Sequence, residues 1–227
     1  VIPITQFVVP AGALINQLRI TDVGGSIGFY IDNIIITSIT GTPTPQFLTL
    51  AQADARYIRQ GTHTIPVMAG AMTARTTNGA AAGSTESTTN KIMSRTLDFD
   101  QSTDEFAQIM IPMPKSWDEG TGTVQFIWTA TATGNVVWGC QAVTLSDDDV
   151  LDAAFGTAVT VTDGVTATTD LMESAFTSAI TIAGTPAAED VVCYQFYRDA
   201  DNAADTVAAD AKLIGVRIKY IIGAADD

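Results

Sequence analysis

From residue 92 to the end of the chain, apolar and polar residues alternate in short runs separated by turn-forming residues. Alternation with a period of two is typical of a strand that buries one face. In the last run, Ile214, Val216 and Ile218 share one face, and Arg217 and Lys219 lie on the other. The alternation predicts eight strands, over residues 94–99, 105–113, 123–131, 135–145, 157–163, 176–183, 190–198 and 211–222.

Eight short strands at this spacing predict an all-β fold, an eight-stranded jelly roll or β-sandwich over residues 92–227. We expect one helix inside it, over residues 146–156, because aspartates at its start suit the helix dipole and Gly156 suits its end. Residues 62–91 lack periodicity and are rich in Thr, Ala, Gly and Ser. This composition predicts an irregular segment that clamps across a surface or a subunit boundary.

The N-terminal part of the chain predicts a separate β-strand segment over residues 1–40, with strands at 4–9, 14–21 and 28–37. Three strands form an incomplete sheet, so they need further strands from upstream or from neighbouring subunits. Residues 41–61 follow as a stiff Thr- and Pro-containing linker and a short helix.

The helix predicted over residues 49–59 is too short to be stable alone. Thr49 and Gln52 are spaced as a capping box at its start. A helix of about eleven residues is marginal in water, so its apolar stripe must pack on another element or on copies of itself. Both alternatives stay open: a trimerising bundle, and a linker helix docked on its own domain. The stripe consists of Leu50, Ala53, Tyr57 and Ile58.

Residues 49–57, with the sequence TLAQADARY, resemble the ADARY helical collar of trimeric bacteriophage tail and head fibre proteins. Further strings between Ile65 and Tyr220 resemble a C-terminal β domain of phage and prophage virion fibre proteins; they are residues 72–80, 97–100, 113–117, 137–139, 183–190 and 196–200. The resemblance implies a homotrimeric fibre, spike or decoration subunit on the virion surface, with capsid, neck or tail proteins as partners. It also implies that Leu50, Ala53, Tyr57 and Ile58 form the subunit interface.

Residues 14–37 resemble the closing strands of the galactose-binding-like jelly roll in carbohydrate-binding modules, where a run similar to FYIDNI ends the domain. This second resemblance implies an alternative function, a carbohydrate-binding adhesion module, with host surface glycan as the partner. The aromatic residues that could stack on sugar are Trp117, Trp128 and Trp138. Trp128 and Trp138 lie inside predicted strands and are expected in the core, whereas Trp117 lies in a predicted loop and is the candidate glycan contact.

The charge of the chain narrows the range of partners. Asp and Glu number 25 against 11 Lys and Arg, which gives a net charge of −14. Such a surface repels phosphate backbones, so we expect no nucleic-acid partner. No apolar run approaches the roughly 18 residues of a membrane span, so we expect no membrane insertion.

The residues offer little for catalysis. His63 is the single histidine and has no evident nucleophile or orienting group beside it, so we expect no enzyme and no cofactor. The acidic runs at 98–105 and 147–149 are more typical of solvated loops than of a glycosidase carboxylate pair. Cys140 and Cys193 lack metal-site spacing, so two buried thiols are expected, with a disulfide between strands as the alternative.

One loop has a faint likeness to a calcium site. Asp199, Asp201 and Asp205 carry oxygen ligands in the run 199–205, but the Gly and the bidentate Glu of a calcium-binding loop are missing. The alternative is a hairpin loop whose side chains bond their own backbone. We therefore predict no metal, with these three aspartates as the candidates if one binds.

Overall fold

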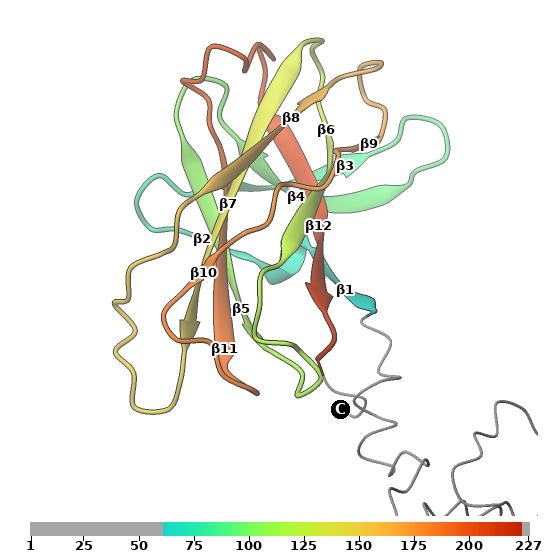
Figure 1. The fold of residues 1–227 in the computed structure, drawn as a ribbon. Helices are drawn as coiled ribbons and strands as arrows, with labels where there is room; N and C mark the ends of the chain where they lie inside the picture. The colour runs from blue at the N-terminus through green and yellow to red at the C-terminus, as the bar shows by residue number, and fades with distance from the viewer. Residues whose placement is uncertain (1–60, 224–227) are drawn as a thin grey trace, which may run out of the picture. The chain divides into compact units, whose positions relative to one another are not determined.

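Two six-stranded β-sheets packed face to face form the described part of the molecule (Figure 1). The computed structural model describes residues 61–223. Sheet A consists of β1 (Thr62–Met68), β3 (Ala81–Glu86), β4 (Met93–Phe99), β6 (Thr123–Thr129), β9 (Met172–Glu173) and β12 (Ala211–Ile221). Sheet B consists of β2 (Thr73–Ala74), β5 (Glu105–Pro112), β7 (Asn135–Leu145), β8 (Val159–Gly164), β10 (Ile182–Ala183) and β11 (Val191–Arg198).

The strand order confirms the predicted all-β sandwich. Sheet A runs β3-β4-β12-β6-β9, with β1 also beside β12. Sheet B runs β10-β7-β11-β5-β2, with β8 also beside β7. Every pair of strands is antiparallel except the short pair of β10 and β7. Because sequence neighbours are often not sheet neighbours, much of the fold depends on contacts between distant residues.

Inward-facing side chains of both sheets form one aromatic core. Trp128 of β6 and Trp138 of β7 are fully buried, with ring centroids 5.9 Å apart in an edge-to-face arrangement. Phe126 stacks on Trp138 and Phe99 meets the same ring edge-on, each at 5.2 Å. Such pairs add about 0.5–1.5 kcal/mol each beyond the burial of their area. The prediction that Trp128 and Trp138 belong to the core is confirmed.

The first and last strands lie side by side. β1 runs antiparallel along the final part of β12, and the N–H of Ile222 donates to the carbonyl of Gly61 at 2.9 Å. The first residue of β12, Ala211, lies at the other end of the sheet, where the loops 100–104 and 199–210 connect the strands. The described domain is therefore entered and left at one end, and we call the end that carries these two loops the distal end.

The irregular clamp predicted over residues 62–91 is wrong, because β1, β2 and β3 lie in it. The sandwich accordingly begins at Thr62 and not at residue 92. Among the described strands β1 pairs with β12 alone, so it is an edge strand, where Pro66 is tolerated despite its missing N–H. β3 is built of small residues that give no alternating pattern. β1 and β2 form because the distant strands β12 and β5 supply their hydrogen bonds, whereas β3 pairs with β4, the next strand along the chain.

The helix predicted over residues 146–156 is also wrong. The N–H of Ser146 donates to Asp149 Oδ2 at 2.8 Å, and the chain makes a single turn there. Val150 and Leu151 are 72% and 81% exposed, so no apolar face is buried to stabilise a helix of this length. The one helical element between residues 61 and 223 is a 3-10 turn, η1 (Ala69–Ala71). No helix in this range is long and apolar enough to span a membrane.

The strand predicted over residues 176–183 is reduced to β10, and the segment before it follows β6 irregularly. Backbone N–H groups three residues apart donate to carbonyls two residues apart, in β6 and directly before it, at 2.8–3.0 Å: Ser174 to Phe126, Thr177 to Val124 and Ile180 to Gly122. The hydroxyls of Ser174 and Thr177 accept the β6 N–H groups in return. The segment therefore uses three residues for every two residues of its partner, and this extra residue prevents a regular ladder of hydrogen bonds.

The two cysteines are free and buried, as one of the two sequence alternatives predicts. Cys140 of β7 lies opposite Phe196 of β11, and Cys193 of β11 lies opposite Val143 of β7. The thiols are therefore offset along the two strands, and burial raises the pKa of both. This offset removes the disulfide alternative.

Candidate functional site

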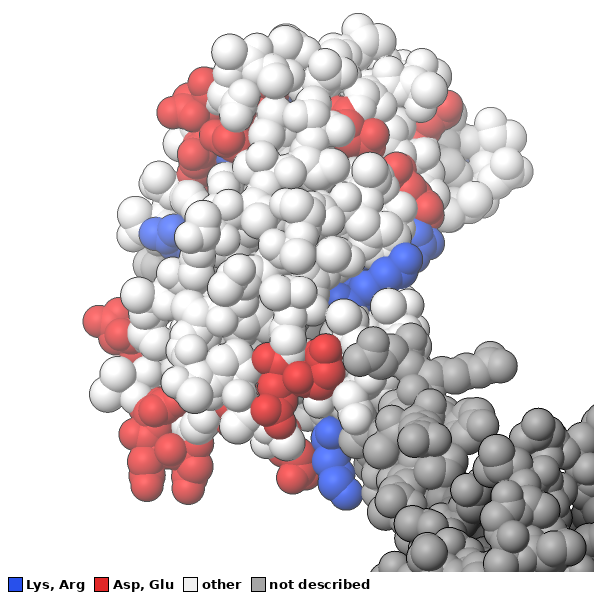
Figure 2. Space-filling view, in the orientation of Figure 1, with Lys and Arg blue, Asp and Glu red and all other residues white. Residues whose placement is uncertain are grey.

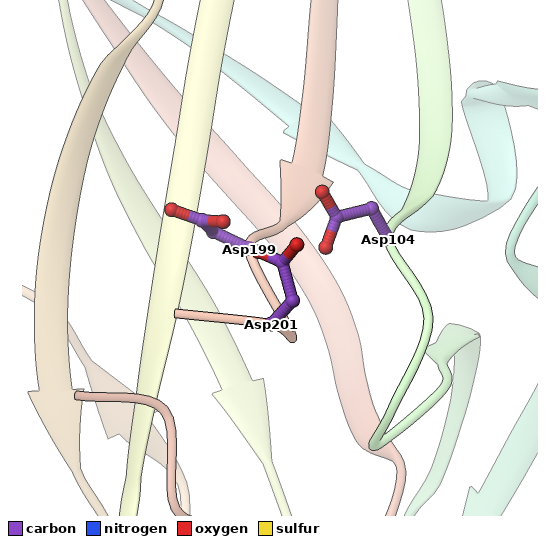
Figure 3. Close-up of side chains that lie close together, drawn as sticks. All are labelled: Asp104, Asp199 and Asp201. Atoms are coloured by element: carbon purple, nitrogen blue, oxygen red, sulfur yellow. The ribbon is translucent and has the colours of Figure 1, made fainter. Parts of the chain in front are cut away.

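Three carboxylates meet at the distal end of sheet B (Figure 3). Asp104 lies just before β5, and Asp199 and Asp201 lie just after β11. The pairing of β5 with β11 brings the three together, and one oxygen of each lies within 4.8 Å of the others. Asp104 also accepts the backbone N–H of Ala200 at 2.8 Å.

The environment of Asp104 disfavours its charge. Burial raises the pKa of Asp104 above the ordinary value, and the negative charges of Asp201 and Asp199 raise it further, while the Ala200 N–H acts in the opposite direction. Carboxylate oxygens are the ligands that Ca²⁺ prefers, so among residues 61–223 this is the cluster that could hold a divalent cation. In the view of Figure 2, acidic side chains gather toward both ends of the domain, and the middle is largely uncharged.

Asp205 does not join this cluster, in contrast to the sequence prediction. Its carboxylate turns inward and forms a bidentate ion pair with Arg198, with distances of 2.6 Å from Nη2 to Oδ1 and 3.0 Å from Nε to Oδ2. Oδ2 also accepts the N–H of Val137 at 3.0 Å. Asp104 takes the place expected for Asp205, and its contribution depends on strand pairing, which the loop sequence does not encode.

Arg198 holds the loop that carries Asp199 and Asp201. Besides its two bonds to Asp205, its Nη1 donates to the carbonyls of Ala209 and Phe99 at 2.8 and 3.3 Å, and Nη2 donates to the carbonyl of Val207 at 2.7 Å. All five guanidinium N–H groups are thus used. The distal loop 199–210 is thereby fixed to the ends of both sheets.

Next to the carboxylates, an aromatic row crosses the outward face of sheet B. Phe106 of β5, Tyr197 of β11 and Gly139 of β7 lie opposite one another, and their strand neighbours Ala107 and Phe196 point into the core. The Phe106 and Tyr197 rings are 5.4 Å apart and tilted by 31°. The Tyr197 ring lies so close over Gly139 that a Cβ there would overlap it. Both rings are partly exposed, so they leave apolar surface accessible on this face.

A row of three glutamines lies beside the aromatic row, one residue pair further along the same strands. Gln108, Gln195 and Gln141 are opposite one another on β5, β11 and β7. Gln195 is only 3% exposed and accepts a hydrogen bond from Gln108 Nε2 at 2.7 Å, while Gln108 and Gln141 are partly exposed. We call the two rows together the aromatic–amide face.

The acidic cluster adjoins this face. Asp199 follows Tyr197 by two residues, and Asp104 precedes its partner Phe106 by two, so both lie one residue pair or more beyond the aromatic row. Burial raises the pKa of Tyr197, and the charges of Asp199 and Asp104 raise it further. The phenol is therefore neutral at physiological pH and can donate a hydrogen bond. Amides, a phenol and carboxylates thus lie together at the distal part of sheet B.

Trp117 is not a surface contact, in contrast to the sequence prediction. Its side chain belongs to the core and is 3% exposed, and its backbone bridges to Ile222. Phe106 and Tyr197 are instead two partly exposed aromatic residues that share one face of sheet B. Both lie in predicted strands, but the sequence does not show that these strands pair.

His63 and the predicted subunit interface complete the sequence candidates. The His63 ring is exposed on β1, with Nδ1 3.2 Å from the hydroxyl of Tyr220 and the two rings edge-to-face. The interface residues Leu50, Ala53, Tyr57 and Ile58, and the strands predicted over residues 1–40, lie outside the described residues.

Comparisons with protein-family models and with curated proteins found no match. Solved structures with a similar architecture include the CBM36-1 domain of a multidomain xylanase from the hindgut metagenome of Trinervitermes trinervoides, with a TM-score of 0.40, 12% identity and coverage of 69% of this chain and 96% of that domain. The CBM22-1–GH10 modules of a Clostridium thermocellum xylanase have a TM-score of 0.41 at 11% identity, over 70% of this chain and 28% of theirs.

A bacteriophage protein is among the similar structures as well. Tailspike protein 4 of bacteriophage CBA120 has a TM-score of 0.30 at 11% identity, over 66% of this chain and 18% of the tailspike. Because all these scores are low, the assignment of the β-sandwich rests on the strand pairing of this chain itself.

Proposed function

We propose that the chain is a structural subunit of a bacteriophage particle, a homotrimeric fibre, spike or decoration protein exposed on the virion. The β-sandwich is then the outer domain, and residues 1–60 connect it to capsid, neck or tail proteins. The proposal takes its class of protein from the ADARY run at residues 49–57 and from the fibre-like strings between Ile65 and Tyr220.

The observation that supports this role best is the pairing of β1 with β12. Because the Ile222 N–H bonds to the Gly61 carbonyl, the domain is attached through one end. The distal loops 100–104 and 199–210 lie at the opposite end of the sandwich from this connection. A domain attached in this way is suited to the tip of a fibre.

The trimer is proposed to form through the helix at residues 49–59, a few residues before Gly61. A helix of this length is not stable alone, and three copies packed around an axis would bury its apolar stripe. In that bundle the axis is lined by Leu50, Ala53, Tyr57 and Ile58.

The test is a pair of charge substitutions in this helix of the full chain. Leu50→Asp places a carboxylate on the stripe, and Arg59→Asp places one off it. We expect Leu50→Asp to dissociate the oligomer, with the sandwich still folded by circular dichroism, and Arg59→Asp to leave the mass in solution unchanged. An unchanged oligomer in the Leu50→Asp variant would contradict the proposed bundle.

A second candidate function, a carbohydrate-binding adhesion module, is favoured by the aromatic–amide face. Aromatic side chains with a few well-placed polar groups are the usual lining of a small-molecule site. The two functions are compatible, because an exposed fibre domain can also contact glycan on a host surface.

A further inference from the structure

We propose that the aromatic–amide face of sheet B binds a neutral, hydroxyl-rich glycan chain. This inference deepens the second candidate function by naming its site and its class of ligand. It is carried by contacts of the described residues and does not depend on the oligomeric state.

The aromatic row supplies the apolar half of the site. The Tyr197 ring lies on the Gly139 backbone, so its exposed surface is on the side that faces away from the sheet. Phe106 continues this surface at a tilt of 31°, and the guanidinium of Arg75 lies 4.4 Å from its centroid. The negative face of an aromatic ring attracts the slightly positive C–H groups of a sugar ring.

The glutamine row supplies the polar half. A side-chain amide carries two donors and an acceptor, which suits hydroxyl groups that both donate and accept. The backbones that carry adjacent glutamines are about 4.8 Å apart, which is the spacing between neighbouring strands. Gln195 is buried and accepts a hydrogen bond from Gln108, which fixes the Gln108 amide, while Gln141 lies partly exposed on the other side of Gln195.

The charges favour a neutral ligand. The carboxylate cluster of Asp104, Asp199 and Asp201 lies where β5 and β11 meet, beside the aromatic row, and the chain carries a net charge of −14. Carboxylates accept hydrogen bonds from sugar hydroxyls but repel sialic acids, uronic acids and phosphates. The Arg75 guanidinium over the Phe106 ring is a cation at this face, but three carboxylates lie beside it, so an acidic polysaccharide is disfavoured.

The pairing of the strands disfavours a peptide. A peptide that adds to a sheet needs a free edge, but β11 is hydrogen-bonded to β5 on one side and to β7 on the other. The centre of the face consequently offers side chains and no free backbone groups. Recognition by side-chain amides and rings suits a glycan better than an extended peptide.

The experiment measures binding of the full chain to an immobilised panel of neutral glucan, galactan, mannan and xylan oligosaccharides, with sialylated and uronic-acid oligosaccharides alongside. Titration calorimetry then gives the affinity for the best neutral ligand. We expect Tyr197→Ala and Gln108→Ala to weaken that affinity about tenfold or more.

Two matched controls lie on sheet A or beside it. Phe176 is partly exposed with Lys219 Nζ 3.7 Å from its ring centroid, and Gln125 accepts a hydrogen bond from Arg217. Phe176→Ala and Gln125→Ala should leave the affinity within about twofold of the original. Melting temperatures of all four variants verify that each is folded.

Three results would overturn the inference: no binding of any neutral oligosaccharide, binding of the acidic oligosaccharides alone, or equal losses in the test and control variants. Weak binding by an intact trimer would contradict this inference and leave the virion role standing. Strong, Tyr197-dependent binding by a monomeric chain would support this inference and contradict the proposed trimeric virion subunit.

Discussion

Arg198 and Asp205 form a fully buried, bidentate ion pair at the distal end of the sandwich, with side chains 0% and 1% exposed. The pair closes the loop that carries Asp199 and Asp201, next to the aromatic–amide face. Buried charges are tolerated where every polar atom finds a partner, and here all five guanidinium N–H groups do. The interior of the domain and its candidate site are therefore linked through one side chain.

Asp205→Ala should destabilise the domain by about 3–5 kcal/mol, because it leaves the Arg198 charge buried and unpaired. Urea unfolding followed by tryptophan fluorescence measures this. The exposed pair of Arg217 and Glu173, 2.9 Å apart, provides the control, and Glu173→Ala should change stability far less than Asp205→Ala does. Equal effects of the two substitutions would show that burial of the ion pair is unimportant.

Gly139→Ala should destabilise the domain by about 1–3 kcal/mol, because the new methyl group overlaps the Tyr197 ring. The same substitution made in a Tyr197→Ala background should have a much smaller effect. Thermal unfolding of the two single variants and the double variant gives the interaction energy. Additive effects would contradict the contact between the ring and the backbone of β7.

Asp104→Asn should stabilise the protein at pH 7 by about 0.2–1 kcal/mol, since Asp104 is partly exposed and the amide keeps an acceptor for the Ala200 N–H. Because the pKa of Asp104 is raised in the folded protein, its protonated form favours folding. This stabilisation is fully present below the ordinary Asp range and is lost as the pH rises through the raised pKa. The advantage of the Asn variant should thus disappear at acidic pH.

Unfolding curves between pH 3 and pH 8 in the presence of a chelator test this dependence on Asp104. An Asn variant that is less stable than the original protein at pH 7 would contradict the repulsion among the three carboxylates.

Cys140 and Cys193 should resist alkylation in the folded protein, because burial keeps both thiols protonated and out of contact with reagent. Intact mass spectrometry after iodoacetamide treatment at pH 8 should show both modified only after denaturation. Rapid modification of Cys140 in the native protein would mean that β7 opens easily.

The sequence was most informative where alternation coincides with burial. β7 spans Asn135–Leu145, as the pattern predicts, and β11 and β12 match within a residue at either end. In these strands the core side chains themselves determine the period. β1 and β3 were missed because they are peripheral strands with small or exposed residues, and their hydrogen bonds come from β12 and β4.

The candidate site was harder to predict than the fold. Asp199 and Asp201 could be named from their loop, but Asp104 joins them only through the pairing of β5 with β11. The turn residues around Trp117 predict a sugar contact in a loop, yet the side chain packs into the hydrophobic core. The aromatic and amide rows depend on strand register, which a single sequence does not specify.

The mass of the full, unsubstituted chain in solution tests the proposed virion role most directly. Sedimentation equilibrium, or light scattering after size exclusion, should give three times the 23.8 kDa of one chain, independent of concentration over the micromolar range. A monodisperse species of 23.8 kDa with residues 49–59 intact would contradict the account.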